Sequence, residues 1–349
     1  MKPAADGWID DHGGSLGRAR ALYPHAPEPW VDLSTGINPN AYPFSALPTT
    51  AFCRLPEPGR LQRLLEVAAN LYGAPSAAHV AAAPGTQILL PQVMALRAPG
   101  RARVLGPTYA EHARAAALAG HSVEEVNDPD ALRHADLAII VNPNNPDGRL
   151  LSRDAMLDIA DDLGRRGGML VVDEAFLDVM ADGPTLAGDV GQPGIVVLRS
   201  FGKFFGLAGV RLGFVLAHPQ VAAGIAAGFG PWAVSGPALE LGLQALADRA
   251  WQDATRARLA ADANRLDAIL ERAGLTVGGG TTLFRFLMHP QASAFADWLG
   301  ARGILARTFS WNGDALRLGL PGSEGEWLRL EEAAVGWRHE AIQRKDTAA

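Results

Sequence analysis

The chain has 349 residues, of which 48% are apolar, and its 31 basic and 37 acidic residues give a formal net charge of −6. This length and apolar content can bury a sizeable core, whereas an acidic balance without a basic stripe argues against nucleic acid as a main partner. A single cysteine, Cys53, leaves no disulfide framework and no cysteine cluster for a metal, which favours a reducing cytoplasm.

Residues 1–50 are rich in proline and glycine, and we expect them to form an ordered N-terminal arm that joins a smaller C-terminal domain. Their polar start has no apolar core segment, so no signal peptide is expected, and no run in the chain approaches membrane-spanning length. The arm contains the tripeptide His12-Gly13-Gly14, which is typical of a flexible turn. Composition alone leaves open whether this turn also binds a ligand.

Residues 51–236 predict a large α/β domain in which short apolar runs alternate with helical stretches. A turn at 56–59 precedes an expected amphipathic helix over 60–72, which ends at Gly73. The expected strands are 79–83, 102–105, 122–126, 137–141, 169–172, 195–198 and 213–217, and the expected helices are 86–97, 109–119 and 153–166. This alternation indicates a doubly wound, largely parallel sheet.

Polar residues follow five of these apolar runs, at 84–87, 107–109, 142–148, 173–176 and 200–203. In doubly wound sheets ligands bind beyond the carboxyl ends of the strands, so we expect these polar residues to gather there. Several also have an ordinary structural interpretation: Gly85 and Thr86 as a plain helix start, Tyr109 as a core tyrosine, and Asp173 as a helix cap. Asp173 is the most informative, because a carboxylate directly after an apolar strand is costly unless it is paired with a cation.

The run 195–214 carries the strongest chemical signal. Lys203 lies between two apolar runs, with Ser200 three residues before it and Arg211 eight residues after it. Lysine is rarely buried unless paired, and desolvation prepares a lysine amine for Schiff-base chemistry. A hydroxyl and a guanidinium beside that amine suit one phosphate ester. An amine next to a phosphate cradle indicates pyridoxal 5′-phosphate (PLP) as the cofactor, with Asp173 facing a protonated pyridine nitrogen.

Residues 237–349 predict a small α+β domain, with a long helix to about 272, strands at 283–287 and 315–319, and helices at 292–302 and 324–343. Arg317 alternates with Leu316 and Leu318 along its strand. Facing inward it would be a bidentate clamp for a substrate carboxylate, and facing outward it would be solvated; the sequence leaves both open. No Gly-x-Gly-x-x-Gly segment follows the early strands, which argues against a nicotinamide enzyme.

Taken together, the motifs Asn-Asn-Pro-Asp-Gly (144–148), Asp-Glu-Ala-Phe (173–176) and Ser-Phe-Gly-Lys (200–203) with Arg211 resemble those of fold type I PLP enzymes, the aspartate-aminotransferase-like group. The resemblance covers nearly the whole chain and implies a homodimer. It implies that Lys203 forms the Schiff base with the cofactor and that Asp173 bonds the pyridine nitrogen. The remaining roles that it implies are the ring oxygen for Asn145, stacking for Tyr109, the phosphate for Gly85, Thr86, Ser200 and Arg211, and the substrate carboxylate for Arg317.

Within that group, the chain is more similar to the threonine-phosphate decarboxylases of cobalamin biosynthesis than to the histidinol-phosphate aminotransferases. The similarity lies in His12-Gly13-Gly14, in the run 32–39 and in the lysine segment 199–214. It implies PLP-dependent decarboxylation of L-threonine O-3-phosphate to (R)-1-aminopropan-2-ol O-phosphate, with a histidinol-phosphate-type aminotransferase as the alternative. His12, Gly13 and Gly14 are the expected contacts of the substrate phosphate, and Asn145 is expected beside the substrate.

Two residues depart from the pattern that the resemblance implies. Phe176 stands where the aminotransferases usually have a tyrosine whose hydroxyl bonds the cofactor's ring oxygen, so Asn145 would be left alone there. Leu55 stands where relatives commonly place a tyrosine that reaches the neighbouring subunit's phosphate. The inter-subunit contact therefore stays open, although the dimer that the fold implies does not depend on it.

Overall fold

The structure is a computed structural model that describes residues 12–348. The start of the chain, where no signal peptide is expected, lies outside the described residues. Tertiary contacts divide the chain into two compact units. Unit 1 comprises the described residues of Met1–Asn40, Pro146–Gly148 and Arg256–Ala349, and unit 2 comprises Ala41–Asn145 and Arg149–Thr255. The domain limits predicted from the sequence are 50/51 and 236/237, and the limits of independently folding domains stay a prediction.

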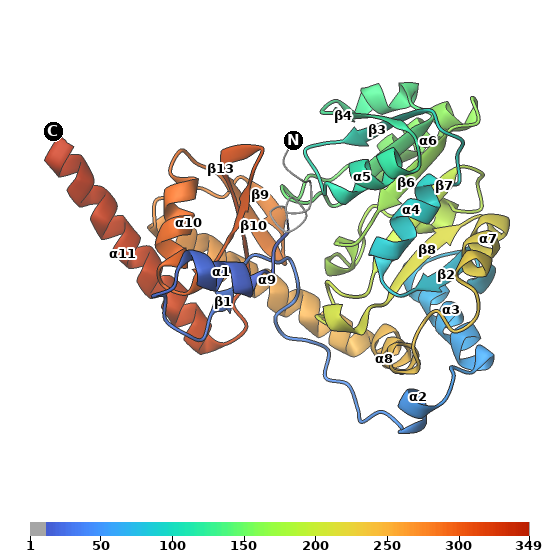
Figure 1. The fold of residues 1–349 in the computed structure, drawn as a ribbon, viewed down its shortest axis with the longest axis horizontal. Helices are drawn as coiled ribbons and strands as arrows, with labels where there is room; N and C mark the ends of the chain where they lie inside the picture. Colours follow the sequence, from blue (N-terminus) through green and yellow to red (C-terminus); the bar gives the residue numbers. More distant parts are fainter. Residues whose placement is uncertain (1–11, 349) are drawn as a thin grey trace. The chain divides into compact units, whose positions relative to one another are not determined.

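Unit 2 is built on a seven-stranded sheet with the order β2-β8-β7-β6-β5-β3-β4 (Figure 1). The strands are β2 (Val80–Ala83), β3 (Arg101–Leu105), β4 (Ser122–Val126), β5 (Leu137–Val141), β6 (Met169–Asp173), β7 (Ile195–Ser200) and β8 (Gly213–Ala217). β8 is antiparallel to both of its neighbours, and the other strands share one direction. The predicted α/β class and the largely parallel sheet are confirmed.

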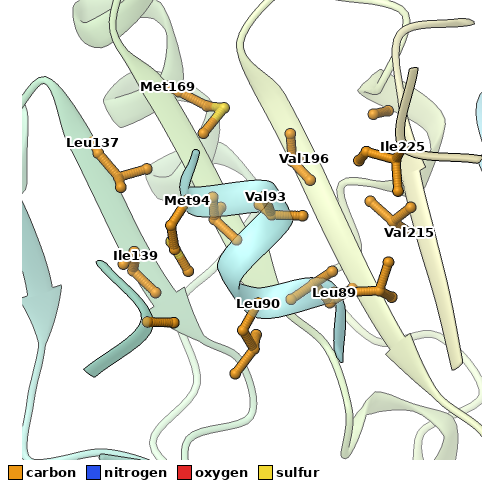
Figure 2. Close-up of a cluster of buried hydrophobic side chains, with 14 of the residues drawn as sticks. Leu89, Leu90, Val93, Met94, Leu137, Ile139, Met169, Val196, Val215 and Ile225 are labelled. Atoms are coloured by element: carbon orange, nitrogen blue, oxygen red, sulfur yellow. The ribbon is translucent and has the colours of Figure 1, made fainter. Parts of the chain in front are cut away.

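Helices cover both faces of this sheet. The α-helices of unit 2 are α2 (Thr50–Cys53), α3 (Pro58–Tyr72), α4 (Leu89–Met94), α5 (Glu111–Leu118), α6 (Arg153–Gly164), α7 (Pro219–Phe229) and α8 (Gly236–Ala247). Apolar residues of α4, α5 and α7 pack on alternate strand residues of one face, and Figure 2 shows α4 lying across the strands. The intervening strand residues, such as Leu170 and Val172, point to the other face and are also buried, next to α6, which contacts β6.

Short 3₁₀ turns connect several of these elements: η1 (Ala77–His79), η2 (Thr86–Ile88), η3 (Pro129–His134), η4 (Leu177–Val179), η5 (Ala187–Asp189) and η6 (Ala208–Val210). The predicted helix 86–97 is therefore a 3₁₀ turn followed by the short helix α4. Helix α3 begins two residues earlier than predicted, because Pro58 occupies its first turn, and it ends at Gly73 in the left-handed conformation. Helix α7 had not been predicted.

The long helix expected over 237–272 is wrong, because two helices occupy this region, α8 and α9 (Arg249–Arg272). They are separated at Asp248, which leaves the helical conformation with φ −86° and ψ 79°. Its Oδ1 accepts a hydrogen bond from the Trp251 amide at 3.0 Å, and its Oδ2 accepts one from the Tyr42 hydroxyl at 3.2 Å. An aspartate that caps a new helix start ends the preceding helix, and hydrophobic periodicity does not report this.

Unit 1 contains a four-stranded antiparallel sheet with the order β12-β13-β10-β9. Its strands are β9 (Gly279–Thr281), β10 (Phe284–Met288), β12 (Arg307–Phe309) and β13 (Asn312–Gly319). In the same unit β1 (Val31–Asp32) pairs in parallel with β11 (Ile304–Leu305), so the N-terminal arm is hydrogen-bonded to the C-terminal part of the chain. Its other helices are α1 (Leu16–Leu22), α10 (Ala292–Gly300) and α11 (Glu324–Ala348). None of the helices in the described part of the chain is both long and apolar enough to span a membrane.

Candidate active site

The strand directions in unit 2 decide which polar residues meet. β2, β3, β5, β6 and β7 point the same way, so the residues after their carboxyl ends lie along one edge of the sheet. β8 runs in the opposite direction, and its first residue therefore lies at that same edge. The register shows this directly, because Gly213 pairs with Ser200 on one side and with Ala83 on the other.

Four residues predicted to hold the cofactor phosphate are brought together there: Gly85, Thr86, Ser200 and Arg211. Gly85 has φ of 87°, and a Cβ on it would lie 3.0 Å from the guanidinium carbon of Arg211. A Cβ on Gly213 would lie 2.5 Å from the amide nitrogen of Thr86. Glycine is thus required at both positions, because the backbone of the turn and the guanidinium approach each other closely.

Arg211 adopts an unusual backbone conformation for a residue with a side chain. Its φ of 55° lies in the left-handed region, which non-glycine residues rarely occupy and which is often found at ligand sites. Its Nη1 donates to the carbonyl oxygen of Ala208 at 3.0 Å, which fixes the guanidinium beside the turn. The cradle therefore offers amide, hydroxyl and guanidinium donors, which is the chemistry that binds a phosphate.

Asp173 ends β6 and is buried together with an unpredicted histidine. Its Oδ1 accepts a hydrogen bond from the Ala175 amide at 3.0 Å, and its Oδ2 lies 2.9 Å from Nε2 of His112. The His112 side chain is 0% exposed. His112 was not predicted as a site residue, although its place three residues after Tyr109, at the start of an expected helix, was an available signal. The helix-cap alternative for Asp173 is insufficient, because its carboxylate also contacts a buried imidazole.

Lys203 lies in the turn after β7, and packed aromatic rings hold this turn. Phe201 and Phe205 stack with ring centroids 4.8 Å apart, and Trp251 stacks on Phe205 at 5.8 Å. The Nζ atom of Lys203 lies 5.5 Å from the ring centroid of Phe176, which is itself buried. The amine thus faces an aromatic ring without a hydroxyl, and its backbone turn has little freedom.

Tyr109 and the loop after β5 are tied to the same edge. The Tyr109 hydroxyl donates to Gln87 Oε1 at 3.0 Å, and this links Tyr109 to the turn that carries Thr86. Tyr109 is half-buried, so it is not a fully buried core tyrosine. Asn144 donates to the carbonyl oxygen of Pro107 at 3.0 Å and accepts from the Thr108 hydroxyl at 2.7 Å. These bonds join the loop that carries Asn145, which is also half-buried, to the loop that carries Tyr109.

Unit 1 brings together most of the residues predicted to bind substrate. The Gly14 amide donates to Ser34 Oγ at 2.7 Å, and a Cβ on Gly13 would overlap the carbonyl oxygen of Ser34. Arg317 Nη2 donates to that same carbonyl oxygen at 2.7 Å. Arg317 is 6% exposed, so of the two orientations left open by the sequence it takes the buried one. His12 is half-buried beside these glycines, and its role stays a prediction.

Arg307 is a further residue that the sequence analysis missed. It is the direct cross-strand partner of Arg317, with Phe286 the partner of Arg317 on the other side. Direct partners project from the same face of a sheet, so the two arginine side chains share one face. Burial lowers the pKa of Arg317 to about 9, the positive charge of Arg307 adds to this, and Asp32 opposes it. Like charges placed opposite each other are unfavourable alone, and an anion between them would relieve the repulsion.

The residues at the edge of unit 2 fit PLP. The cradle of Gly85, Thr86, Ser200 and Arg211 presents donors to a phosphate, and a Cβ on Gly85 would fill it. Asp173 would hold the pyridine nitrogen through the carboxylate that His112 orients, and Lys203 would supply the amine. Each group of the cofactor thus has a chemically matched residue in the described part of the chain.

Comparisons with known proteins agree with this chemistry. The family model for aminotransferase class I and II matches residues 54–331. The threonine-phosphate decarboxylase of Pseudomonas aeruginosa is 42% identical over 334 residues, which cover 95% of this chain and 99% of that protein. The threonine-phosphate decarboxylase of a Sinorhizobium species is 42% identical over 329 residues, covering 92% and 96%.

A solved structure supports the fold. Histidinol-phosphate aminotransferase from Sinorhizobium meliloti, in complex with pyridoxal-5′-phosphate, matches with a TM-score of 0.78 at 20% identity and covers 93% of this chain and 94% of that one. The predicted fold type I architecture and the PLP cofactor are therefore confirmed. The chain belongs to the class I and II aminotransferase family of PLP-dependent enzymes.

Proposed function

We propose that this enzyme decarboxylates L-threonine O-3-phosphate to (R)-1-aminopropan-2-ol O-phosphate in cobalamin biosynthesis. The Cα–carboxylate bond breaks, CO₂ leaves, and a proton takes its place on Cα. Two relatives that are 42% identical over nearly the whole chain support this assignment.

The pairing of Arg307 with Arg317 carries the proposal. The proposed substrate has two anionic groups, a carboxylate and a phosphate. Two arginines on one face of the sheet match these two groups better than a single arginine would. Arg317, the more deeply buried, is suited to the planar carboxylate as a bidentate partner. Arg307 is half-buried and would add its charge to the phosphate, together with the Gly13–Gly14 turn and His12.

Holding both anionic ends of the substrate determines which bond at Cα is broken. When bound, PLP supplies an electron sink for the electron pair of the bond held perpendicular to its ring. Decarboxylation requires the Cα–carboxylate bond in that orientation, whereas transamination requires the Cα–H bond there instead. The amine of Lys203 is the group suited to return a proton to Cα after CO₂ has left. Asp173, whose carboxylate His112 orients, would hold the pyridine nitrogen.

A product assay tests the proposal. Purified enzyme saturated with PLP is incubated with L-threonine O-3-phosphate, and CO₂ and the amine product are measured without any keto acid. We expect CO₂ and aminopropanol phosphate in equal amounts, and neither from Lys203→Ala. The proposal is wrong if turnover requires 2-oxoglutarate and yields glutamate, or if L-histidinol phosphate is the better amino donor.

The enzyme is further proposed to act as a cytoplasmic homodimer. Three large apolar side chains in the stretch 44–55 are exposed: Phe44, Phe52 and Leu55. Such a concentration of apolar surface is typical of a contact between subunits. Leu55 has no polar group with which to reach a partner's phosphate. Light scattering of Phe52→Glu beside the unaltered enzyme tests the dimer, and an unchanged dimer mass would exclude this stretch from the interface.

A further inference from the structure

A buried ionic cluster lies next to the cofactor residues, and nothing in the chemistry above uses it. Arg199 alternates with Leu198 and Ser200 on β7, so its side chain lies on the face of the sheet opposite to Ser200. Its Nη1 donates to Glu174 at 2.7 Å, and its Nη2 is ion-paired with Asp178. The guanidinium carbon also lies 4.4 Å from the ring centroid of Tyr72.

The carboxylate of Glu174 has a complete set of donors. Besides Arg199, Glu174 accepts hydrogen bonds from the Thr185 hydroxyl at 2.7 Å and from the Leu186 amide at 2.9 Å. Burial raises the pKa of Glu174, and the charge of Arg199 with these hydrogen bonds opposes that rise. Buried ion pairs stabilise a fold no better than apolar packing of the same volume does. Stability alone therefore does not account for the cluster, and we ask which segments its ion pairs hold in position.

The three charged members of the cluster lie within two residues of cofactor-site residues or of Phe176. Glu174 follows Asp173, Arg199 precedes Ser200, and Asp178 lies two residues after Phe176. The guanidinium of Arg199 thus binds the first and the last residue of the turn 174–178. Phe176, in the middle of this turn, faces the amine of Lys203. The same guanidinium joins the end of β6 to the end of β7, which are neighbours in the sheet.

We propose that Arg199 is a positioning residue for the cofactor. By binding both Glu174 and Asp178, Arg199 sets the distance between two segments. One is the end of β6 with the turn after it, which carries Asp173 and Phe176, and the other is the end of β7 with the turn after it, which carries Ser200 and Lys203. Arg199 thereby controls PLP affinity without touching PLP. The inference rests on the cofactor site and not on the identity of the substrate, so it can fail while the proposed decarboxylation stands.

The test separates positioning from general stability. Arg199→Met keeps an unbranched chain as far as the position of Nε and removes the guanidinium with its charge. Val197→Ala opens a cavity on the same face of the same strand, where Val197 is fully buried. For each apoenzyme, the thermal unfolding midpoint and the dissociation constant of added PLP are measured. We expect Arg199→Met to weaken PLP binding by about tenfold, and Val197→Ala to change it by less than about twofold at a comparable loss of stability. Loss of PLP affinity in proportion to lost stability in both variants overturns the proposal.

A milder variant covers the case in which Arg199→Met does not fold. Asp178→Asn keeps the shape of the side chain but removes its charge and weakens the hold on the turn. It should weaken PLP binding and shift the pH midpoint of the visible absorbance of the Lys203-bound cofactor, because Phe176 would move against the amine. Arg199→Lys, which keeps the charge and loses the fork, should restore part of the affinity lost in Arg199→Met. Unchanged affinity and an unchanged absorbance profile in Asp178→Asn would show that the cluster does not position the cofactor.

Discussion

The Nε2 atom of His112 lies 2.9 Å from Oδ2 of Asp173, and both side chains are buried. The histidine comes from α5, and the aspartate comes from the end of β6, sixty-one residues further along the chain. The imidazole orients one carboxylate oxygen, and the Ala175 amide orients the other. This arrangement supplies a fixed negative charge at the place where a pyridine nitrogen is expected.

Replacing His112 should therefore damage both the fold and the cofactor site. His112→Phe leaves Oδ2 of Asp173 buried without its imidazole partner, which should lower the free energy of unfolding by about 1–3 kcal/mol. PLP binding should weaken as well, since the carboxylate is no longer oriented. Chemical denaturation and PLP titration of the apoenzyme measure the two effects. His134→Phe, at an exposed position, is the control, and equal behaviour of the two variants would contradict this role.

Substrate binding should weaken at alkaline pH, because the pKa of Arg317 is lowered to about 9. The protonated guanidinium is the form that binds an anion, so affinity is kept below that pH and is lost as the pH rises through it. The KM for L-threonine O-3-phosphate, measured from about pH 7 to pH 10, should rise on the alkaline side.

Arg307→Gln provides the matched variant for that pH profile. Removing the neighbouring positive charge raises the pKa of Arg317, so the alkaline rise in KM should move to higher pH. At neutral pH the same variant should bind the substrate about tenfold more weakly, because one charged hydrogen-bond donor is gone. An alkaline rise at the same pH in both proteins would mean that a different group titrates.

Because Gly85 lies close to Arg211, a side chain added at position 85 should reduce both stability and PLP binding. Gly85→Ala places a Cβ against the guanidinium and in a backbone conformation, φ 87° and ψ 158°, that is essentially restricted to glycine, which should cost about 1–3 kcal/mol of stability. It should also weaken PLP binding, because Arg211 must move. Gly59→Ala is the control: Gly59 lies in α3 with no neighbouring atom near its Cβ position, and alanine there should be neutral or stabilising by about 0.5–1 kcal/mol. Equal PLP affinity in the two variants would exclude Gly85 from the phosphate cradle.

Phe176→Tyr tests the surroundings of the Lys203 amine. Phe176 is buried with its ring 5.5 Å from the lysine nitrogen, so an added hydroxyl would enter the site close to the linkage between Lys203 and the cofactor. If that hydroxyl donates to the cofactor's ring oxygen, the oxygen holds the linkage proton less strongly. The pH midpoint of the visible absorbance should then fall. A midpoint that does not move would show that position 176 is out of reach of the ring oxygen.

Local patterns in the sequence were sufficient for the strands of the seven-stranded sheet, the fold class and the cofactor, and they proposed the site residues. Apolar runs of strand length show where strands lie whatever they pair with, and Lys203 with Ser200 and Arg211 forms a chemical pattern within twelve residues. The break at Asp248 was not predictable in this way, because the bond from Tyr42 that helps to hold it comes from far along the chain.

Strand order and direction, and every pairing between distant residues, were decided by the tertiary structure alone. Arg211 reaches the cofactor edge because β8 runs antiparallel, Arg307 faces Arg317 because of the register of β12 on β13, and Arg199 meets Glu174 and Asp178 across two strands. The sequence around a single arginine or histidine does not show which distant residue its side chain will contact. Its charge acquires a role only when folding removes it from water and leaves it one neighbour with which to pair.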